Sequence, residues 1–331
     1  MIDKFGLKHS RRCCPLDKSK VPIFFSLIDY RNNYFTSNDP KKILEFYDGF
    51  DNRDQLIQWM RERPTGVANI HEVEGNKDII VVIPTADFNG QYAKECRDNI
   101  FKGLHIVFVE SAEIPDPYFN GAHNVNVGIR KAMGYNPKWV VFSGDDMYKI
   151  DEVTKLTNVL SKLNSDEIDC VLTKKSLYHS IPKLIIKNNH VTNFVNLIRD
   201  GIYGKIINDT FKKFDVKILI SEDRFVQRLF CKVIRYEDFI DFGIFSRRFL
   251  IENGNKLFDE TFINESEDSD LSLNIYYENK TVAHVDYKIG DLIGMSLGIG
   301  VDRKMRAIAG LTYFNYKWDK KVLKVMKRRR L

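Results

Sequence analysis

The chain has 331 residues, of which 44% are hydrophobic and 29% are charged, so it can bury a substantial core in one large domain or two modest ones. No apolar run approaches the roughly 20 residues that span a bilayer, and the first residues lack the core of a signal peptide. We therefore expect a cytoplasmic protein. Five cysteines without a CxxC spacing argue against a disulfide framework and a zinc site, which leaves reduced thiols.

The net charge of +6 is unevenly distributed. Residues 320–331 hold seven basic residues and no acidic one, so the rest of the chain sums to 6 − 7 = −1. This basic tail alternates cations with apolar side chains, which suits peripheral contact with an anionic inner membrane face; a solvated end is the alternative. The near-neutral body shows no basic stripe with interleaved aromatic residues, so we expect no specific nucleic-acid partner.

Residues 1–77 are interpreted as an N-terminal extension of unknown role. Residues 21–28 favour a strand, and residues 54–63 a short charged helix. The apolar residues of this helix are expected to pack on the main domain; they are Leu56, Ile57, Trp59 and Met60.

From residue 78 the pattern alternates between strands and helices. The predicted strands cover 79–83, 105–109, 139–142 and 168–173, and the predicted helices cover about 91–102, 121–133 and about 152–163. This alternation predicts an α/β fold in which helices cover both faces of a mainly parallel sheet. Residues 175–238 follow no recognisable pattern and are interpreted as an insertion.

The helix over 121–133 has the clearest boundary signals. Asn120 is the expected N-cap and Gly134 the expected C-terminal stop. Helical periodicity places one set of apolar residues on the inward face, namely Ala122, Val125, Ile129, Ala132 and Met133. It leaves three polar residues on the other side, namely Asn124, Asn126 and Arg130.

The next strand, 139–142, leads through Ser143-Gly144 into two adjacent carboxylates, Asp145 and Asp146. Open α/β sheets bind ligands at the carboxyl ends of their strands, so this pair is a candidate binding site. The alternative is that the pair only caps a turn or starts the next helix.

The order of these motifs resembles that of the GT-A glycosyltransferases, especially the inverting family 2. Their helix with an Asn-x-Gly motif corresponds to Asn126–Gly128, and their strand with a terminal acidic motif to residues 139–146. Other resembling segments are 79–85 with Asp87, the acceptor-side blocks 242–250, 257–262 and 265–271, and the closing segment 313–318. The resemblance implies a GT-A (Rossmann-like) catalytic domain over 78–319, with a nucleotide-sugar half (78–174), the insertion (175–238) and an acceptor half (239–319).

The resemblance also implies an activity. A sugar moves from a nucleoside diphosphate donor, with a UDP-sugar favoured over a GDP-sugar, to a hydroxyl of a glycan, lipid-linked or protein acceptor by inverting single displacement. Mn2+ or Mg2+ offsets the charge of the leaving diphosphate. Asp146 is the expected direct ligand and His284 a second one, although His284 alone resembles an ordinary surface histidine. The family's first acidic position falls on Gly144, which leaves one ligand fewer.

The same resemblance assigns Asp268 as the base for the acceptor hydroxyl, with Glu267 as the fallback. A capping box between Asn264 and Glu267 is the structural alternative. The expected contacts to the nucleotide sugar are Pro84, Thr85, Asp87, Glu110, Asn126, Asp145 and Arg303. Glu110 is alternatively a polar strand end, and the glycine-punctuated stretch 290–300 before Arg303 is either a lid or a flexible connection.

Two other functions remain open. One is a nucleotidyltransferase on a related fold, although the loop Pro84–Gly90 lacks the basic residues which that reaction needs. The other is a non-catalytic nucleotide or nucleic-acid binding protein.

Overall fold

The computed structural model describes residues 40–63, 65–112, 120–173, 183–186, 193, 196–198, 200–221, 231–236, 239, 241–263, 265–291 and 301–322. The predicted strand over 21–28 and most of the basic tail lie outside these ranges. Within the described residues, no helix is both long and apolar enough to cross a membrane.

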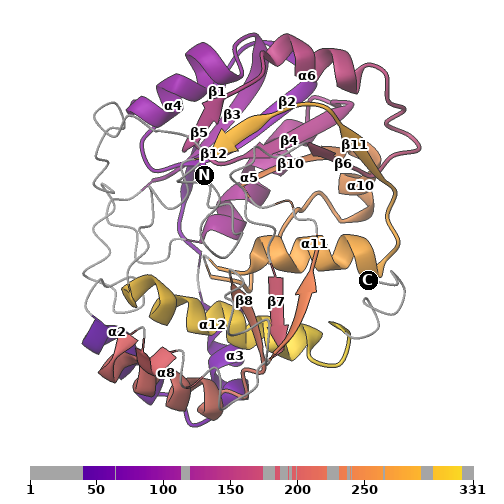
Figure 1. The fold of residues 1–331 in the computed structure, drawn as a ribbon. Coiled ribbons are helices and arrows are strands. Elements are labelled where there is room, and N and C mark those ends of the chain that lie inside the picture. Colours follow the sequence, from indigo (N-terminus) through magenta and orange to yellow (C-terminus); the bar gives the residue numbers. More distant parts are fainter. Residues whose placement is uncertain are drawn as a thin grey trace.

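A seven-stranded sheet forms the centre of the molecule (Figure 1), in the order β1-β3-β2-β4-β10-β6-β11. In chain order, its strands are β1 (Ala68–Val73), β2 (Asn76–Thr85), β3 (Leu104–Ser111), β4 (Trp139–Ser143), β6 (Cys170–Thr173), β10 (Phe242–Ser246) and β11 (Val282–Val285). The pairings run five strands in one direction and only β1 and β10 in the other. The prediction of a mainly parallel sheet is therefore confirmed.

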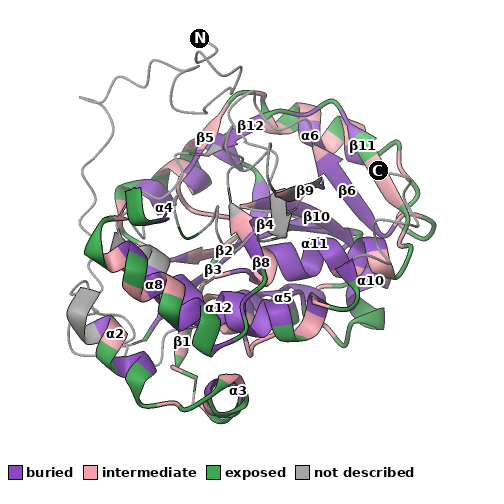
Figure 2. Cartoon of the chain, turned by 60° about the horizontal axis from the view of Figure 1, so that its bottom comes forward, coloured by how far each residue is buried: buried purple, intermediate pink, exposed green. Residues whose placement is uncertain are grey.

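Helices cover both faces of this sheet, as predicted. One face carries α4 (Gln91–Glu95), the π-helix η2 (Cys96–Ile100) and α6 (Val153–Leu160). The other face carries α5 (Gly121–Met133), α10 (Arg247–Glu252), α11 (Glu267–Tyr277) and α12 (Val301–Trp318). Figure 2 shows the buried residues concentrated between these layers. The predicted helix over 91–102 thus divides into α4 and η2. The residues expected on its inward face are all buried, namely Ala93, Cys96, Ile100 and Phe101.

A second layer packs against α12 below the sheet (Figure 1). It contains α2 (Pro40–Asp48), α3 (Arg53–Glu62), α8 (Ile202–Lys213) and a small sheet of β8 (Ile218–Ser221), β7 (Lys183–Ile186) and β9 (Lys232–Arg235). In α3, Leu56, Ile57 and Met60 are buried, as the sequence predicts. The chain before residue 78 also supplies β1, an edge strand of the central sheet.

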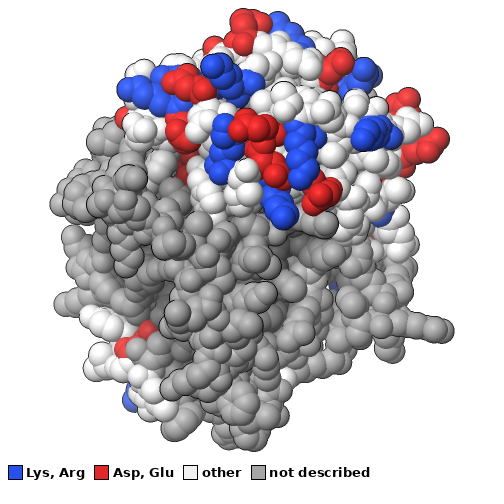
Figure 3. Space-filling model, turned by 45° about the horizontal axis from the view of Figure 1, so that its top comes forward, with Lys and Arg blue, Asp and Glu red and all other residues white. Residues whose placement is uncertain are grey.

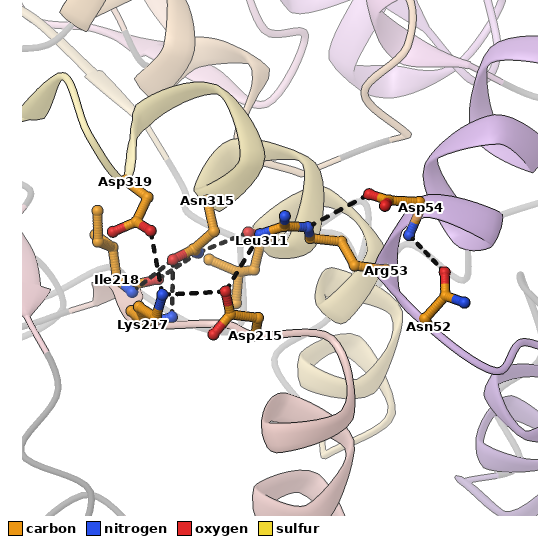
Figure 4. A network of polar contacts seen from close by, with 9 residues as sticks. All are labelled: Asn52, Arg53, Asp54, Asp215, Lys217, Ile218, Leu311, Asn315 and Asp319. Atoms are coloured by element: carbon orange, nitrogen blue, oxygen red, sulfur yellow. Dashed lines mark hydrogen bonds and ion pairs between the residues drawn. The ribbon is translucent and has the colours of Figure 1, made fainter.

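Asn315 joins α12 to this layer (Figure 4). Its Oδ1 accepts hydrogen bonds from the amides of Lys217 and Ile218, and its Nδ2 donates to the carbonyls of Ile218 and Leu311. The side chain is fully buried, so these four bonds satisfy polar groups that would otherwise be costly to bury. Helix α12 therefore has a fixed position relative to β8.

Helix α5 begins and ends where the sequence predicts, and Asn120 caps it by accepting a hydrogen bond from the amide of His123. The expected inward face is buried. The expectation that Asn124 and Asn126 lie on the other side is wrong, because their side chains are 4% and 0% exposed. Helical periodicity assigns polar side chains such as asparagine to the solvent-facing side. Here the side-chain amide of Asn126 is buried, and distant residues form its hydrogen bonds.

The close packing of α5 on the sheet depends on Gly128. A Cβ at this position would lie 2.4 Å from a methyl group of Val82 and 2.8 Å from one of Val109. Since such contacts are too short for any real side chain, only glycine lets the helix approach β2 and β3 this closely. The first turn of α5 is thereby held at the carboxyl edge of these two parallel strands.

Candidate active site at the carboxyl edge of the sheet

The parallel strands β2, β3 and β4 bring candidate residues to one edge of the sheet. Thr85 at the end of β2 pairs with Glu110 on β3, and Thr85 Oγ1 donates a 2.7 Å hydrogen bond to Asp145 Oδ2 beyond β4. Pro84, one residue earlier, pairs with Val109. The acidic pair therefore lies at the ligand-binding edge, as its position after a buried strand predicts.

Asp145 is held in a poorly solvated place. Burial raises the pKa of its carboxyl group to about 6, although hydrogen bonds from Thr85 and from backbone amides oppose this change. Cys96 Sγ lies 3.4 Å from the carbonyl of Asp145, at the start of η2. Burial, and then the charges of Asp146 and Asp145, raise the pKa of Tyr92 on α4 to about 12. Helix α4 and the start of η2 thus lie next to the acidic pair.

The loop after β2 is held in place by contacts within the protein. Asp87 organises its turn, because its carboxylate accepts a hydrogen bond from Asn89 N and its carbonyl accepts one from Gly90 N. Phe88 stacks against His71 with ring centroids 4.3 Å apart, and the guanidinium of Arg97 lies 5.0 Å from the centre of the same ring. The aromatic side chain in this loop is therefore covered by the protein itself.

Glu110 is also engaged within the protein. Its Oε1 accepts a hydrogen bond from Phe88 N at 2.9 Å, and its Oε2 lies 2.9 Å from His71 Nε2. The carboxylate reaches the expected edge of the sheet. Both of its oxygens already have protein partners.

Beyond Asp146 the chain turns into β5 (Met147–Lys149), which pairs with β12 (Ile289–Asp291). The pairing places Asp291 opposite Met147, the residue after Asp146. Gly290 belongs to β12 and not to a loose connection, because the ring of Tyr148 occupies the space of its missing side chain, with the nearest ring atom 2.0 Å from a Cβ at this position. The expectation that residue 290 starts a lid or flexible segment is therefore wrong for Gly290 itself.

The residues at this edge fit a divalent cation only in part. Within the described residues, no group of three or more His, Cys, Asp or Glu side chains is placed to hold a metal ion. Mg2+ is commonly held by one or two carboxylates together with substrate phosphates, which matches Asp146 and Asp145. A Cβ on Gly144 would lie 3.1 Å from Asp146 Oδ1, so position 144 directly adjoins the Asp146 carboxylate.

His284 does not join this group. It is exposed on β11, an edge strand separated from β4 by β10 and β6. Because neighbouring strands lie about 4.8 Å apart, β4 and β11 are separated by roughly 14 Å. The alternation expected around it is confirmed, since Val285 and Tyr287 are buried while His284 and Asp286 are exposed.

The acidic first turn of α11 begins at a distorted residue. Ser266 has φ +75° and is 5% exposed, a left-handed conformation that is uncommon for a residue with a side chain. The helix begins at Glu267, so Glu267 is its first residue and not the third, and the expected capping box is wrong. Asp268 Oδ1 accepts a 2.5 Å hydrogen bond from Ser269 N.

A buried ionic network fixes the orientation of α11. Asp270 accepts hydrogen bonds from Lys317 Nζ at 2.8 Å and from Trp318 Nε1 at 2.7 Å, and Lys317 also contacts Asp259 at 2.9 Å. Burial raises the pKa of Asp270 despite the Lys317 cation. The segment 313–318 therefore closes the fold by locking α12 onto α11, which the family resemblance did not specify.

One short segment connects α11 with the acidic pair. Tyr236 OH lies 2.7 Å from Ser269 Oγ, and five residues later the carbonyl of Asp241 accepts a 2.8 Å hydrogen bond from Gly144 N. Tyr236 and Asp241, five positions apart in the chain, thus contact the first turn of α11 and the end of β4, respectively.

Of two further expected contacts to the nucleotide sugar, Asn126 is occupied within the protein, and Arg303 stays a prediction. Asn126 uses both acceptor positions for the amides of Leu257 and Phe258, and both donor positions for Phe258 O and Glu260 Oε1. This side chain therefore anchors the segment 257–260 to α5. Arg303 lies in the first turn of α12, and its side chain is outside the described part of the chain.

Sequence reasoning missed the pair formed by His123 and Glu260, whose Nδ1 and Oε2 atoms are 2.7 Å apart. The two residues are 137 positions apart, so no local spacing joins them. The only available signal was a histidine in the first turn of a helix that starts at the ligand-binding edge.

Models of known protein families and curated protein sequences give no match to this chain.

Proposed function

We propose that the protein is a metal-dependent glycosyltransferase. The observation that carries this proposal is the meeting of Thr85, Glu110, Asp145 and Asp146 at the carboxyl edge of three parallel strands. Nucleotide ligands of open α/β sheets bind at such an edge. The order of motifs along the chain supports the GT-A type and a UDP-sugar donor, with a GDP-sugar as the alternative.

In this proposal the acceptor hydroxyl oxygen attacks the anomeric carbon, and the bond from that carbon to the diphosphate breaks with inversion. Asp146 helps to hold Mn2+ or Mg2+, which offsets the negative charge of the departing diphosphate. Asp268, in the first turn of α11, takes the proton of the hydroxyl. The short link through Tyr236–Asp241 supports placing this carboxylate near the donor edge.

The distribution of charge favours this function over nucleic-acid binding. On the face shown in Figure 3, Lys and Arg side chains alternate with Asp and Glu side chains over the described surface. Nucleic-acid binding surfaces carry a basic patch or stripe, which this face lacks over its described part.

A donor-hydrolysis screen tests the proposal, because slow transfer to water requires no acceptor. Purified protein is incubated with UDP- and GDP-sugars and Mn2+ or Mg2+, and the released nucleoside diphosphate is quantified. Nucleoside triphosphates with sugar phosphates form a parallel set, in which pyrophosphate release identifies a nucleotidyltransferase. Release of nucleoside diphosphate from one donor is expected; pyrophosphate release alone, or no turnover of any donor, contradicts the proposal.

A further inference from the structure

His123 is held in one orientation by the loop before α11. Its Nδ1 lies 2.7 Å from Glu260 Oε2, while Asn126 Nδ2 donates to the other carboxylate oxygen at 3.0 Å. Asn120 Nδ2 donates to the carbonyl of Glu260 at 2.8 Å. Arg130 of α5 also lies 3.6 Å from Glu260 Oε1. The N-cap Asn120 and three side chains of α5 therefore hold Glu260, and its carboxylate fixes the imidazole ring.

The ionisation of Glu260 determines which nitrogen of His123 carries hydrogen. Burial acts to raise the pKa of Glu260, but hydrogen bonds from His123 and Asn126 outweigh it and lower the pKa to about 2. The carboxylate is therefore ionised at neutral pH and can only accept hydrogen bonds. Nδ1 of His123 must be the donor, so the lone pair of the neutral ring lies on Nε2.

When the ring is neutral, this lone pair is available to a ligand. Within the described residues, Nε2 of His123 has no hydrogen-bond partner, and the side chain is 18% exposed. The contrast with two other histidines is informative, because Nε2 of His71 is bound to Glu110 and Nε2 of His105 to Glu72. Of these three histidines, only His123 keeps its Nε2 open.

His123 lies in the first turn of α5, at the edge of the sheet that carries the candidate site. Helix α5 connects β3 to β4 and crosses over β2 and β3 at Gly128, so its first turn lies at the carboxyl edge of those strands. This is the edge that carries Thr85 and Asp145. In Figure 2, α5 lies next to α11 on the same face of the sheet. His123 therefore lies at the same edge of the sheet as Thr85 and contacts the segment 257–262 through Glu260.

We propose that Nε2 of His123 accepts a hydrogen bond from a hydroxyl group of the nucleotide-sugar donor, on either the ribose or the transferred sugar. This inference rests on the proposed function. A lone pair on neutral Nε2 pairs with an O–H group and not with a phosphate oxygen, which is itself an acceptor. The family resemblance assigns Glu110 to the nucleobase or ribose of the donor, but both of its oxygens already have protein partners. A different hydrogen-bond acceptor at this edge, such as Nε2 of His123, could then bind the donor hydroxyl.

The first test reads the histidine ring directly. Imidazole 15N–1H correlation spectra of the full chain at pH 8 are expected to show His123 as the Nδ1–H tautomer. Glu260→Gln is expected to give a mixture, because an amide group holds the ring less firmly. The spectra are then recorded with UDP, GDP, UDP-glucose and GDP-mannose, and the nucleotide that binds is expected to shift the Nε2 resonance of His123.

The second test measures binding by calorimetry for wild type and His123→Leu. Loss of one hydrogen bond, worth about 0.5–1.5 kcal/mol, predicts a roughly three- to tenfold weaker affinity. An equal loss for the nucleotide and its sugar conjugate identifies the ribose as the partner, and a loss for the conjugate alone identifies the transferred sugar. Lys131→Gln is the matched control, because Lys131 pairs with Glu72 at the other end of α5. Unchanged circular dichroism establishes that the variants fold.

The outcomes separate the two proposals. Binding of a nucleotide sugar without a change at Nε2, and with the same affinity in His123→Leu, overturns this inference while leaving the proposed function intact. Failure of wild type to bind any of the four compounds contradicts both.

Discussion

Thr85 and Asp145, 60 residues apart in the chain, are joined by a 2.7 Å hydrogen bond from Thr85 Oγ1 to Asp145 Oδ2. The bond links the ends of β2 and β4 and directs the carboxylate of Asp145 toward Thr85. In the proposed function Asp146 is the carboxylate that engages a metal ion, which defines the first experiment.

Asp146→Ala is expected to reduce metal-dependent donor hydrolysis at least about 100-fold, because a cation bound to the leaving diphosphate provides several kcal/mol of charge stabilisation. The assay compares Mn2+, Mg2+ and chelator, and calorimetry measures Mn2+ binding. Asp166→Ala, which removes an exposed acid in the turn between α6 and β6, is the control. Full turnover by Asp146→Ala, or by wild type in chelator, would show the metal assignment to be wrong.

Asp268→Asn keeps the shape of the side chain and removes its proton affinity. Transfer to an acceptor is expected to fall about 100-fold or more, since a positioned base contributes on the order of 10²–10⁴ to the rate, while donor affinity stays within a few-fold. Rates and calorimetric affinities are compared with those of Asp54→Asn on α3. If donor binding is lost instead, Asp268 belongs to the donor pocket. Retained anomeric configuration in the product would exclude the inverting mechanism.

The Glu260 carboxylate predicts a dependence of stability on pH. Its pKa is lowered from 4.5 to about 2 in the fold, where burial is outweighed by the hydrogen bonds from His123 and Asn126. A lowered pKa contributes stability above pH 4.5, and this contribution is lost as the pH falls toward 2; because a quarter of the side chain is exposed, we expect about 1–3 kcal/mol.

Urea unfolding of wild type and Glu260→Gln at pH 7 and pH 3 measures this contribution. The difference between the two proteins is expected to be large at pH 7 and to shrink at pH 3. A difference that stays constant between these pH values would mean that the charge of Glu260 is not the source of its stabilisation.

Gly310 allows α12 to pack against the chain just before α11. A Cβ at this position would lie 2.4 Å from the carbonyl oxygen of Glu265. Gly310→Ala is therefore expected to lower the free energy of unfolding by about 1–3 kcal/mol and to displace the acidic first turn of α11, which lowers turnover. Gly49→Ala, where the nearest atom is 3.3 Å away, is the control. Equal stability of Gly310→Ala and wild type would contradict the packing argument.

Deletion of residues 320–331 is expected to abolish salt-sensitive binding to anionic liposomes and to leave donor hydrolysis in solution unchanged. Each basic residue near an anionic surface contributes about 1 kcal/mol, so seven of them are enough for reversible docking. Co-sedimentation with vesicles at low and high salt measures the effect. Equal binding by the full-length and truncated proteins would favour a solvated tail and remove the main reason to expect a lipid-linked acceptor.

Several elements could be predicted because their signals are local. Helix α5 carries its own N-cap and apolar periodicity, and β4 is an apolar run that ends in Ser-Gly. Backbone hydrogen bonding and the burial of one helical face depend on neighbouring residues, so a short window contains the information. The placement of the acidic pair followed from the same reasoning, since a buried strand must deliver its last residues to an edge of the sheet.

The partners of individual side chains were decided by tertiary structure alone. The sequence placed Asn126 on the polar face of α5, whereas the structure buries it against residues more than 130 positions away. The capping box at Glu267 was plausible from spacing, yet the packing of α12 around Gly310 holds the preceding turn in another conformation. The order of motifs in the chain suggested His284 as a metal ligand, but it lies on β11, the edge strand that β10 and β6 separate from β4. Local periodicity determines which face of an element is apolar, whereas the partner of a buried polar group depends on which distant segment packs against it.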